Sequence, residues 1–310
     1  MTDRLSDADA DAAATAWQLD GRPLRAAAWM SGAMLCFSSM AVAGREVARL
    51  GISPPELMMW RSFIGVAIIV AILGARGSLS TVRVRRTPMH LIRNAAHFTG
   101  QNLWFFAVAT IPLAQLFAFE FTSPIWVAIL APLVLRERFT RTRVLSATLG
   151  FIGILIVARP GTAPLGLEHA AAALCAIAFA FNVMTTKMLS RTESTASILL
   201  MMTVTQSVFG IVATYFYSGI TLPDLSSVPL IVVVALAGLT AHFCLTSALG
   251  CAPATVVAPM EFLRLPLIAV VGVMVYGEPL EIAVFAGGAV VLAANLLNIR
   301  AERRARALAG

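Results

Sequence analysis

Stretches of about twenty apolar residues, the length that a helix needs to cross a membrane, follow one another along almost the whole chain. Ten stretches meet that requirement. Their approximate bounds are 25–44, 55–74, 87–109, 113–135, 142–158, 166–186, 195–217, 227–249, 254–275 and 280–299. The sequence therefore predicts an all-α integral membrane protein with ten transmembrane helices.

The composition agrees with this fold class. Of 310 residues, 59% are hydrophobic and 13% are charged, whereas about a quarter of a soluble domain is charged. The net charge of +7 arises from basic residues between the apolar stretches, so we expect no nucleic-acid partner. The four cysteines lie within or beside apolar stretches, where thiols act as small hydrophobic groups, and a disulfide framework is not expected.

Both ends of the chain are expected to be cytoplasmic tails. Residues 1–24 begin with alternating Asp and Ala and contain neither an apolar core nor a cleavage site. This pattern is typical of a disordered segment rather than a signal peptide. Residues 301–310 form a second, basic tail.

The basic residues predict the orientation of the spans, because loops on the cytoplasmic side carry an excess of Lys and Arg. With the N-terminus inside, the inner segments hold 17 such residues and the outer loops hold 3. The inner ones are Arg4, Arg22, Arg25, Arg76, Arg83, Arg85, Arg86, Arg136, Arg138, Arg141, Arg143, Lys187, Arg191, Arg300, Arg303, Arg304 and Arg306, and the outer ones are Arg45, Arg49 and Arg159. We therefore expect a multi-pass inner-membrane protein with both termini in the cytoplasm.

The chain also contains an internal duplication. A shift of 141 positions places the segment 112–137 on 253–278 without a gap, and three residue types coincide. The coincidences are Pro112 with Pro253, Glu120 with Glu261 and Glu137 with Glu278. The repeat divides the protein into two units of five spans, 25–158 and 159–300. Because five is odd, the second unit must enter the membrane from the opposite side, and inverted repeats of this kind are typical of secondary transporters.

Polar side chains inside the spans are the candidates for a substrate site. An ionised side chain at the centre of a span costs roughly 2.5–3.5 kcal/mol on insertion scales, so each needs a partner, a wet cavity or a proton. The candidates are Arg61, His97, Gln101, Glu120, Asn182, His242, Glu261 and Arg264. Two of them lie on the third span, where residues 90, 94, 97 and 101 form one polar helix face that cannot face lipid.

Charge suggests a role for each candidate. We expect the two arginines to bind an anionic group of the substrate, and the two glutamates to bind a cationic group or carry a coupling proton. The amides and histidines would supply hydrogen bonds, and Trp60 and Trp104 could stack on a flat substrate. The cavity would be lined by the third, fourth, eighth and ninth helices, around which the first, second, sixth and seventh would move.

A purely structural role is the alternative for the same charges. Glu261 and Arg264 are three residues apart on one helix face and could neutralise each other. Arg61 could neutralise Glu120 across two helices. Glu137 and Glu278, at the ends of their spans, are expected to act as gate or capping residues.

No enzyme motif accompanies these groups. The chain contains no GxSxG, HExxH, P-loop or CxxC motif, so we expect neither an enzyme, a metal site nor a cofactor. Without a nucleotide site, transport would be driven by a gradient, such as one of protons, or by exchange. Two alternatives remain open, a helical membrane scaffold or sensor that transports nothing, and a passive channel.

Several stretches resemble the EamA-type ten-span transporters of the drug/metabolite transporter superfamily. They are ISPPELMMWRSFIG at 52–65, IPLAQLFAFEFTSPIWVAILAPLVLRERFTRTR at 111–143, GFIGILIVARPG at 150–161, and APATVVAPMEFLRLPL followed by YGEP within 252–279. The resemblance covers residues 25–300, and Arg61 matches a frequently basic position of the family. It implies a carrier for a small polar or zwitterionic metabolite that works by alternating access. Segment 93–105 is similar to metabolite-uptake members such as S-adenosylmethionine carriers.

Overall fold

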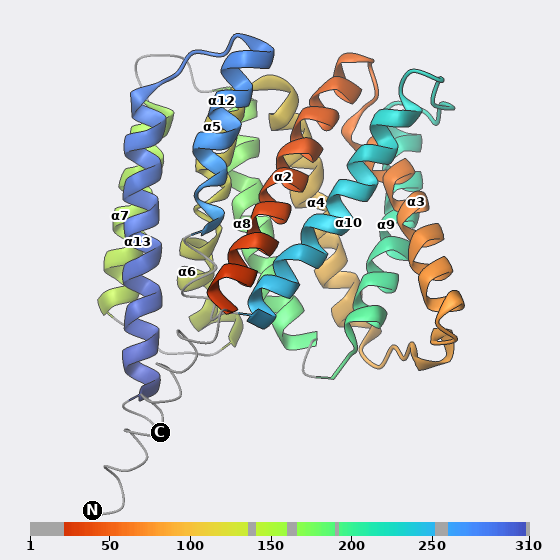
Figure 1. Cartoon of the computed structure of the whole chain (residues 1–310), viewed down its shortest axis with the longest axis horizontal. Helices are drawn as coiled ribbons and strands as arrows, with labels where there is room; N and C mark the ends of the chain where they lie inside the picture. Colours follow the sequence, from red (N-terminus) through yellow and green to blue (C-terminus); the bar gives the residue numbers. More distant parts are fainter. Residues whose placement is uncertain (1–21, 136–140, 160–165, 190–191, 252–259, 308–310) are drawn as a thin grey trace, which may run out of the picture.

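The computed structural model of the chain is built from helices throughout the residues that it describes, which are 22–135, 141–159, 166–189, 192–251 and 260–307 (Figure 1). Eleven α-helices and one short 3-10 helix are assigned within these ranges. They are α2 (Arg22–Arg49), α3 (Pro54–Ala75), η1 (Leu79–Thr81), α4 (Thr87–Thr110), α5 (Leu113–Glu120), α6 (Ser123–Leu135), α7 (Arg141–Ala158), α8 (Leu167–Leu189), α9 (Thr195–Tyr217), α10 (Val228–Cys251), α12 (Arg264–Tyr276) and α13 (Ile282–Ala307).

Where the structure describes them, the ten predicted stretches fall in helices, but α4, over the third stretch, is not among the helices apolar enough to cross a membrane. Seven helical segments are long and apolar enough to cross a membrane, and 144–158 and 264–276 are shorter apolar helices. The fourth stretch is divided, because α5 ends at Glu120 and α6 begins at Ser123. The ninth has a similar interruption at 262–263, before α12. The chain is therefore an all-helical membrane protein in which two of the predicted spans are broken.

The helix boundaries repeat along the chain. α4 and α10 begin at 87 and 228 and end at 110 and 251, both steps of 141 residues. α6 and α12 repeat in the same way, from 123 to 264 and from 135 to 276. The N-terminal caps of α3 and α9 repeat too, since Ser53 and Ser194 each accept a hydrogen bond from the backbone N–H three residues later. Local sequence thus specifies the same helix boundaries twice.

Helix pairing follows the repeat. The most extensive contacts join α2 to α10, α4 to α8, α3 to α9 and α7 to α13 (Figure 1). The shift of 141 residues relates α2 to α8 and α4 to α10, so it converts the α2–α10 pair into the α8–α4 pair. The other two pairs, α3 with α9 and α7 with α13, each join a helix to its own equivalent in the repeat. Every one of these pairs joins the two halves of the chain, so the halves are packed into one bundle.

Small residues allow the closest of these approaches. A Cβ atom added to Gly287 of α13 would lie 2.6 Å from the carbonyl oxygen of Gly153 on α7, and one added to Gly153 would lie 2.9 Å from that of Gly287. Gly210 of α9 lies equally close to the backbone of Met59 on α3. Glycine is required at these crossings because it lets two helix backbones touch.

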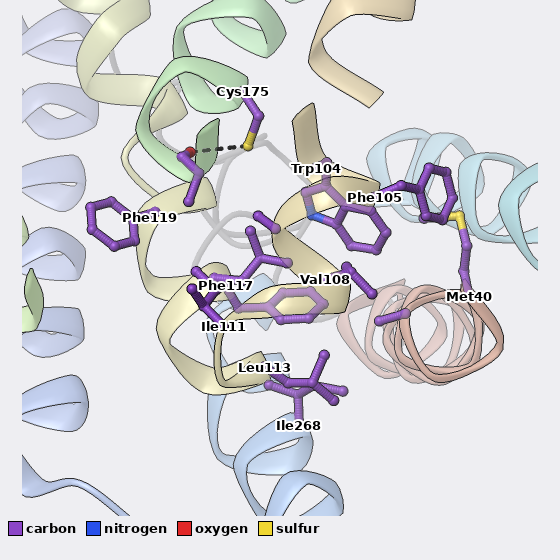
Figure 2. Packing of buried hydrophobic residues seen from close by; sticks show 14 of the residues in the cluster. Met40, Trp104, Phe105, Val108, Ile111, Leu113, Phe117, Phe119, Cys175 and Ile268 are labelled. Atoms are coloured by element: carbon purple, nitrogen blue, oxygen red, sulfur yellow. Dashed lines mark hydrogen bonds between the residues drawn. The ribbon is translucent and has the colours of Figure 1, made fainter. Parts of the chain in front are cut away.

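The base of the bundle is defined here as the end where α2 begins and α13 ends, and the top as the end where α2 and α12 end (Figure 1). A buried apolar cluster fills the upper part between α2, α4, α5 and α12. Figure 2 shows Trp104 and Phe105 of α4 beside Phe117 of α5, with Leu113 and Ile268 packed below them in that view. This cluster separates the polar centre of the bundle from its top.

Candidate functional site

The two interrupted spans place their glutamates at equivalent points. Glu120 is the last residue of α5, and Phe121 and Thr122 form a two-residue turn before α6. Glu261 is likewise a helical residue followed by a two-residue turn before α12. At the first turn the Asn295 side chain of α13 donates to the carbonyl oxygen of Phe121 at 3.1 Å. Broken helices of this kind occur at the binding sites of transporters.

A cavity of about 330 Å³ lies beside both breaks. Its walls come from α2, α4, α5, α6, α8, α10, α13 and the segment from Glu261 into α12. Eight of the ten predicted site residues line it, namely His97, Gln101, Trp104, Glu120, Asn182, His242, Glu261 and Arg264. The four helices expected to form its wall do so, and the first, sixth and tenth spans contribute as well.

Glu120 is held by two donors. Arg264 Nη2 donates to its Oε1 at 2.7 Å, and the Trp104 indole N–H donates to its Oε2 at 2.8 Å. The side chain of Arg264 is 7% exposed and that of Glu120 is 19% exposed. This buried ion pair joins the first half of the chain to the second.

Aromatic rings surround the arginine of that pair. The Arg264 guanidinium carbon lies 4.6 Å from the ring centre of Phe117, 4.8 Å from Phe37 and 5.1 Å from Phe121. Cation–π contacts at these distances stabilise a desolvated guanidinium. Arg264 is therefore fixed on three sides and positions Glu120 rather than projecting freely into the cavity.

The remaining glutamate has a different environment. Glu261 is half-buried and lines the cavity. Among the described residues no hydrogen bond or ion pair reaches its carboxylate, although Arg264 is only three positions away. Arg264 forms its direct ion pair with Glu120 of the other half instead of with Glu261, although its charge also acts on Glu261.

The polar face of α4 contacts several neighbouring helices. Asn94 donates to Thr205 of α9, and the His97 Nδ1 atom shares a hydrogen bond with Gln206 of the same helix. Arg61 of α3 donates to the Gln101 Oε1 atom at 2.6 Å. The suggested Arg61–Glu120 pair is therefore wrong. The amide of Gln101 holds Arg61 outside the immediate cavity wall.

Trp60 and Arg61 are the two predicted site residues that the structure does not place on the cavity wall. Trp60 packs edge-on against Phe63, with ring centres 5.8 Å apart, and its indole nitrogen is buried without a hydrogen-bond partner in the described part of the chain. Trp60 packs against the buried apolar cluster, whereas the adjacent Arg61 donates to Gln101 of α4.

Phe37, Phe179 and Asn295 are among the residues of the cavity wall that sequence reasoning missed. Phe37 contacts His242 edge-on, with ring centres 5.4 Å apart, and Phe179 lies 6.3 Å from His97. Nothing distinguishes these two phenylalanines from others in apolar stretches. Asn295 could have been found, because an amide inside an apolar span requires a partner.

The top of the bundle is closed by a second ion pair. Arg45 of α2 pairs with Glu278, which follows α12, and their side chains are 8% and 13% exposed. Arg45 also donates to the carbonyl oxygens of Val108, at 2.6 Å, and Ile111, while the N–H of Leu113 donates to Glu278 Oε2 at 2.9 Å. The expectation for Glu278 agrees with this placement at a joint between the halves. Its repeat partner Glu137 lies outside the described residues.

A separate hollow of about 380 Å³ lies between α2, α10 and α12. Its lining is almost entirely apolar, with Glu46 as the one charged residue among those that line it. It lacks the convergent polar groups of the central cavity, which is therefore the candidate site.

Comparison with known proteins finds a family domain and several relatives. Residues 24–159 match the model of the EamA-like transporter family. The first half of the chain therefore carries an EamA-like domain. A riboflavin transporter of Brucella anthropi is 28% identical to this chain over 258 residues, which are 82% of the chain and 90% of the relative. An S-adenosylmethionine uptake transporter of Rickettsia bellii is 25% identical over 250 residues, or 81% of the chain and 85% of the relative.

The fold also has a counterpart among solved structures. One crystal structure, 19% identical, superposes with a TM-score of 0.59 and covers 90% of this chain and 98% of its own. This likeness is one of fold. The relatives named above are transporters rather than enzymes.

Proposed function

We propose that this protein is a secondary carrier that moves a small polar metabolite across the bacterial inner membrane by alternating access. The observation that carries the proposal is the cavity between the two sequence repeats, where both glutamate-bearing spans are broken. A site at the interface of two repeats, built from discontinuous helices, is the recurrent arrangement of secondary transporters. The excess of basic residues in alternate connections supports ten crossings, inverted repeats and cytoplasmic termini.

Alternating access requires each end of the site to close in turn. In this orientation the top of the bundle faces the periplasm. The Arg45–Glu278 pair and the apolar cluster beneath it would close that side in the present conformation. To admit substrate from the periplasm, the halves would separate at this joint. We therefore infer that the described state is closed to the outside.

The cavity chemistry suits a flat metabolite with polar edges. Trp104, Phe37 and Phe179 offer rings, while His97, Gln101, Asn182 and His242 offer hydrogen-bonding groups. Its size of about 330 Å³ falls at the lower end of ordinary ligand sites. Riboflavin and S-adenosylmethionine, which name the relatives, are both ring-bearing metabolites of this kind and are the first substrates to test.

The proposed test is uptake into proteoliposomes. Purified protein should accumulate labelled riboflavin or S-adenosylmethionine with saturation, and unlabelled substrate inside should accelerate entry by exchange. A scaffold or sensor would produce no flux. A channel would produce flux with neither saturation nor counterflow, and either result would overturn the carrier proposal. Repeating uptake with an imposed pH gradient tests whether transport is coupled to protons.

A further inference from the structure

The repeat makes Glu120 and Glu261 equivalent, yet their surroundings are not equivalent. Glu120 accepts from both Arg264 and Trp104, whereas Glu261 has no hydrogen bond or ion pair within the described ranges. We propose that Glu261 recognises a cationic group of the transported metabolite, while Glu120 positions Arg264 and does not bind substrate. This inference rests on the proposed carrier function and specifies its substrate class as sulfonium-bearing metabolites.

The repeat explains why Glu261 lacks partners. The shift of 141 residues relates Arg264 to Ser123 and Trp104 to Leu245. At the positions equivalent to the two donors of Glu120, the surroundings of Glu261 therefore contain a serine and a leucine. Serine is much shorter than arginine and leucine has no donor. The second half has thus lost both of the contacts that hold the carboxylate of the first half.

The same two replacements leave space beside the unpartnered carboxylate. Ser123 and Leu245 both line the cavity together with Glu261. Side chains smaller than arginine and tryptophan occupy these places, and the cavity extends to them. The volume in which a ligand would sit therefore borders the carboxylate that lacks a partner.

Charge determines what would fill that space. A carboxylate within a membrane span needs a counter-charge, a proton or water, and Arg264 is committed to Glu120. Phe262 adjoins Glu261 and also lines the cavity. An acidic group beside an aromatic ring is a favourable environment for ammonium or sulfonium groups, which attract both carboxylates and ring faces. An anionic metabolite would be repelled from the same position.

The test compares two probes that differ by one positive charge. S-adenosylmethionine carries a sulfonium group, and its demethylated thioether has nearly the same shape without that charge. Competition for uptake in proteoliposomes yields the ratio of their apparent affinities. We expect the wild type to prefer the sulfonium compound by about tenfold or more, because the sulfonium adds a positive charge that the Glu261 carboxylate attracts.

Matched variants assign that preference to a residue. Glu261→Gln should abolish the preference for the sulfonium compound and leave the melting temperature near that of the wild type. Glu120→Gln, the same change at the equivalent position, should lower the melting temperature while any remaining uptake keeps the preference. Ser123→Arg provides a second route, since it restores the missing arginine beside Glu261 and should also remove the preference.

The outcomes separate this inference from the carrier proposal. Wild-type uptake without a charge preference, or a preference that survives both Glu261→Gln and Ser123→Arg, would overturn the role of Glu261 while leaving a carrier. Riboflavin, which lacks a cationic group, serves as the third probe. An absence of flux for all three compounds would overturn the carrier proposal and this inference with it.

Discussion

Arg45 and Glu278 form a buried ion pair that joins the end of α2 to the segment after α12, 233 positions later in the chain. Breaking such a pair by removing one partner typically costs about 3–5 kcal/mol, because the remaining charge stays buried. Separation of the helices at the top of the bundle would relieve that cost by admitting water. The pair therefore biases the protein toward the closed state described here.

Glu278→Gln should shift the protein toward a conformation that is open at the top. We expect faster labelling of a cavity cysteine by a membrane-impermeant maleimide added from the outside. The measurement uses Met40→Cys, which reports from the cavity wall, in a background from which the four native cysteines have been removed.

The control is the neighbouring surface pair between Arg49 and Glu46, whose side chains are 57% and 35% exposed. Exposed pairs of this kind contribute little, so Glu46→Gln should leave the labelling rate unchanged. Equal labelling in the Glu278→Gln variant and its parent would show that the buried pair does not hold the top closed.

Trp104→Phe should lower stability, whereas Trp60→Phe should not. The first removes the indole donor to Glu120, and loss of a hydrogen bond to a charged group costs about 1.5–3 kcal/mol. The second removes a buried indole N–H with no partner in the described residues, which should be neutral or stabilising. Thermal unfolding in detergent measures both. A drop in melting temperature for Trp60→Phe as large as for Trp104→Phe would contradict this assignment.

Gly287→Ala should destabilise the contact between α7 and α13. The new Cβ atom would lie 2.6 Å from a backbone oxygen that cannot move independently, and overpacking of this kind costs about 1–3 kcal/mol. Gly74→Ala is the control, because its Cβ would meet only Leu79 at 3.7 Å. Alanine is preferred to glycine inside helices, so that variant should be at least as stable as the wild type. Thermal unfolding again provides the comparison, and equal stability of the two variants would argue against a tight α7–α13 crossing.

Arg61 and Gln101 should be energetically coupled. The hydrogen bond between them spans α3 and α4 at 2.6 Å, and no carboxylate pairs with Arg61 in the described part of the chain. A double-mutant cycle with Arg61→Met and Gln101→Leu should yield a coupling at or above about 0.6 kcal/mol, the average for polar contacts between membrane helices. Additive losses of stability would indicate that Arg61 has another partner.

The positions of the helices could be predicted because length and hydropathy alone decide which segments can cross a membrane. Pro124 and Pro266, just after the breaks at 121–122 and 262–263, indicated that each span could bend, but the sequence did not specify a turn at those residues. The breaks depend on tertiary contacts such as the one from Asn295 to Phe121. The duplication was indicated by three coincident residues, and both helix boundaries repeat for α4 with α10 and for α6 with α12.

The residues that line the site could largely be predicted from the sequence, whereas the ion pairs among them could not. Charged residues inside spans must converge on a shared polar space, and eight of ten candidates do so. Which arginine meets which glutamate depends on packing across the two halves. Spacing along one helix favoured Glu261 for Arg264, and the rings of Phe37, Phe117 and Phe121 direct the guanidinium to Glu120 instead.

The serine at position 123 has a consequence for how such a protein can diversify. After a gene doubles, two identical halves form a symmetric pocket, and every substitution shared by both halves changes two walls at once. Because Ser123 stands at the position equivalent to Arg264, the surroundings of Glu120 can stay constant while those of Glu261 accumulate changes. Specificity for a new substrate could then arise through mutations around Glu261 alone, while the Glu120–Arg264 ion pair and the helix packing stay intact.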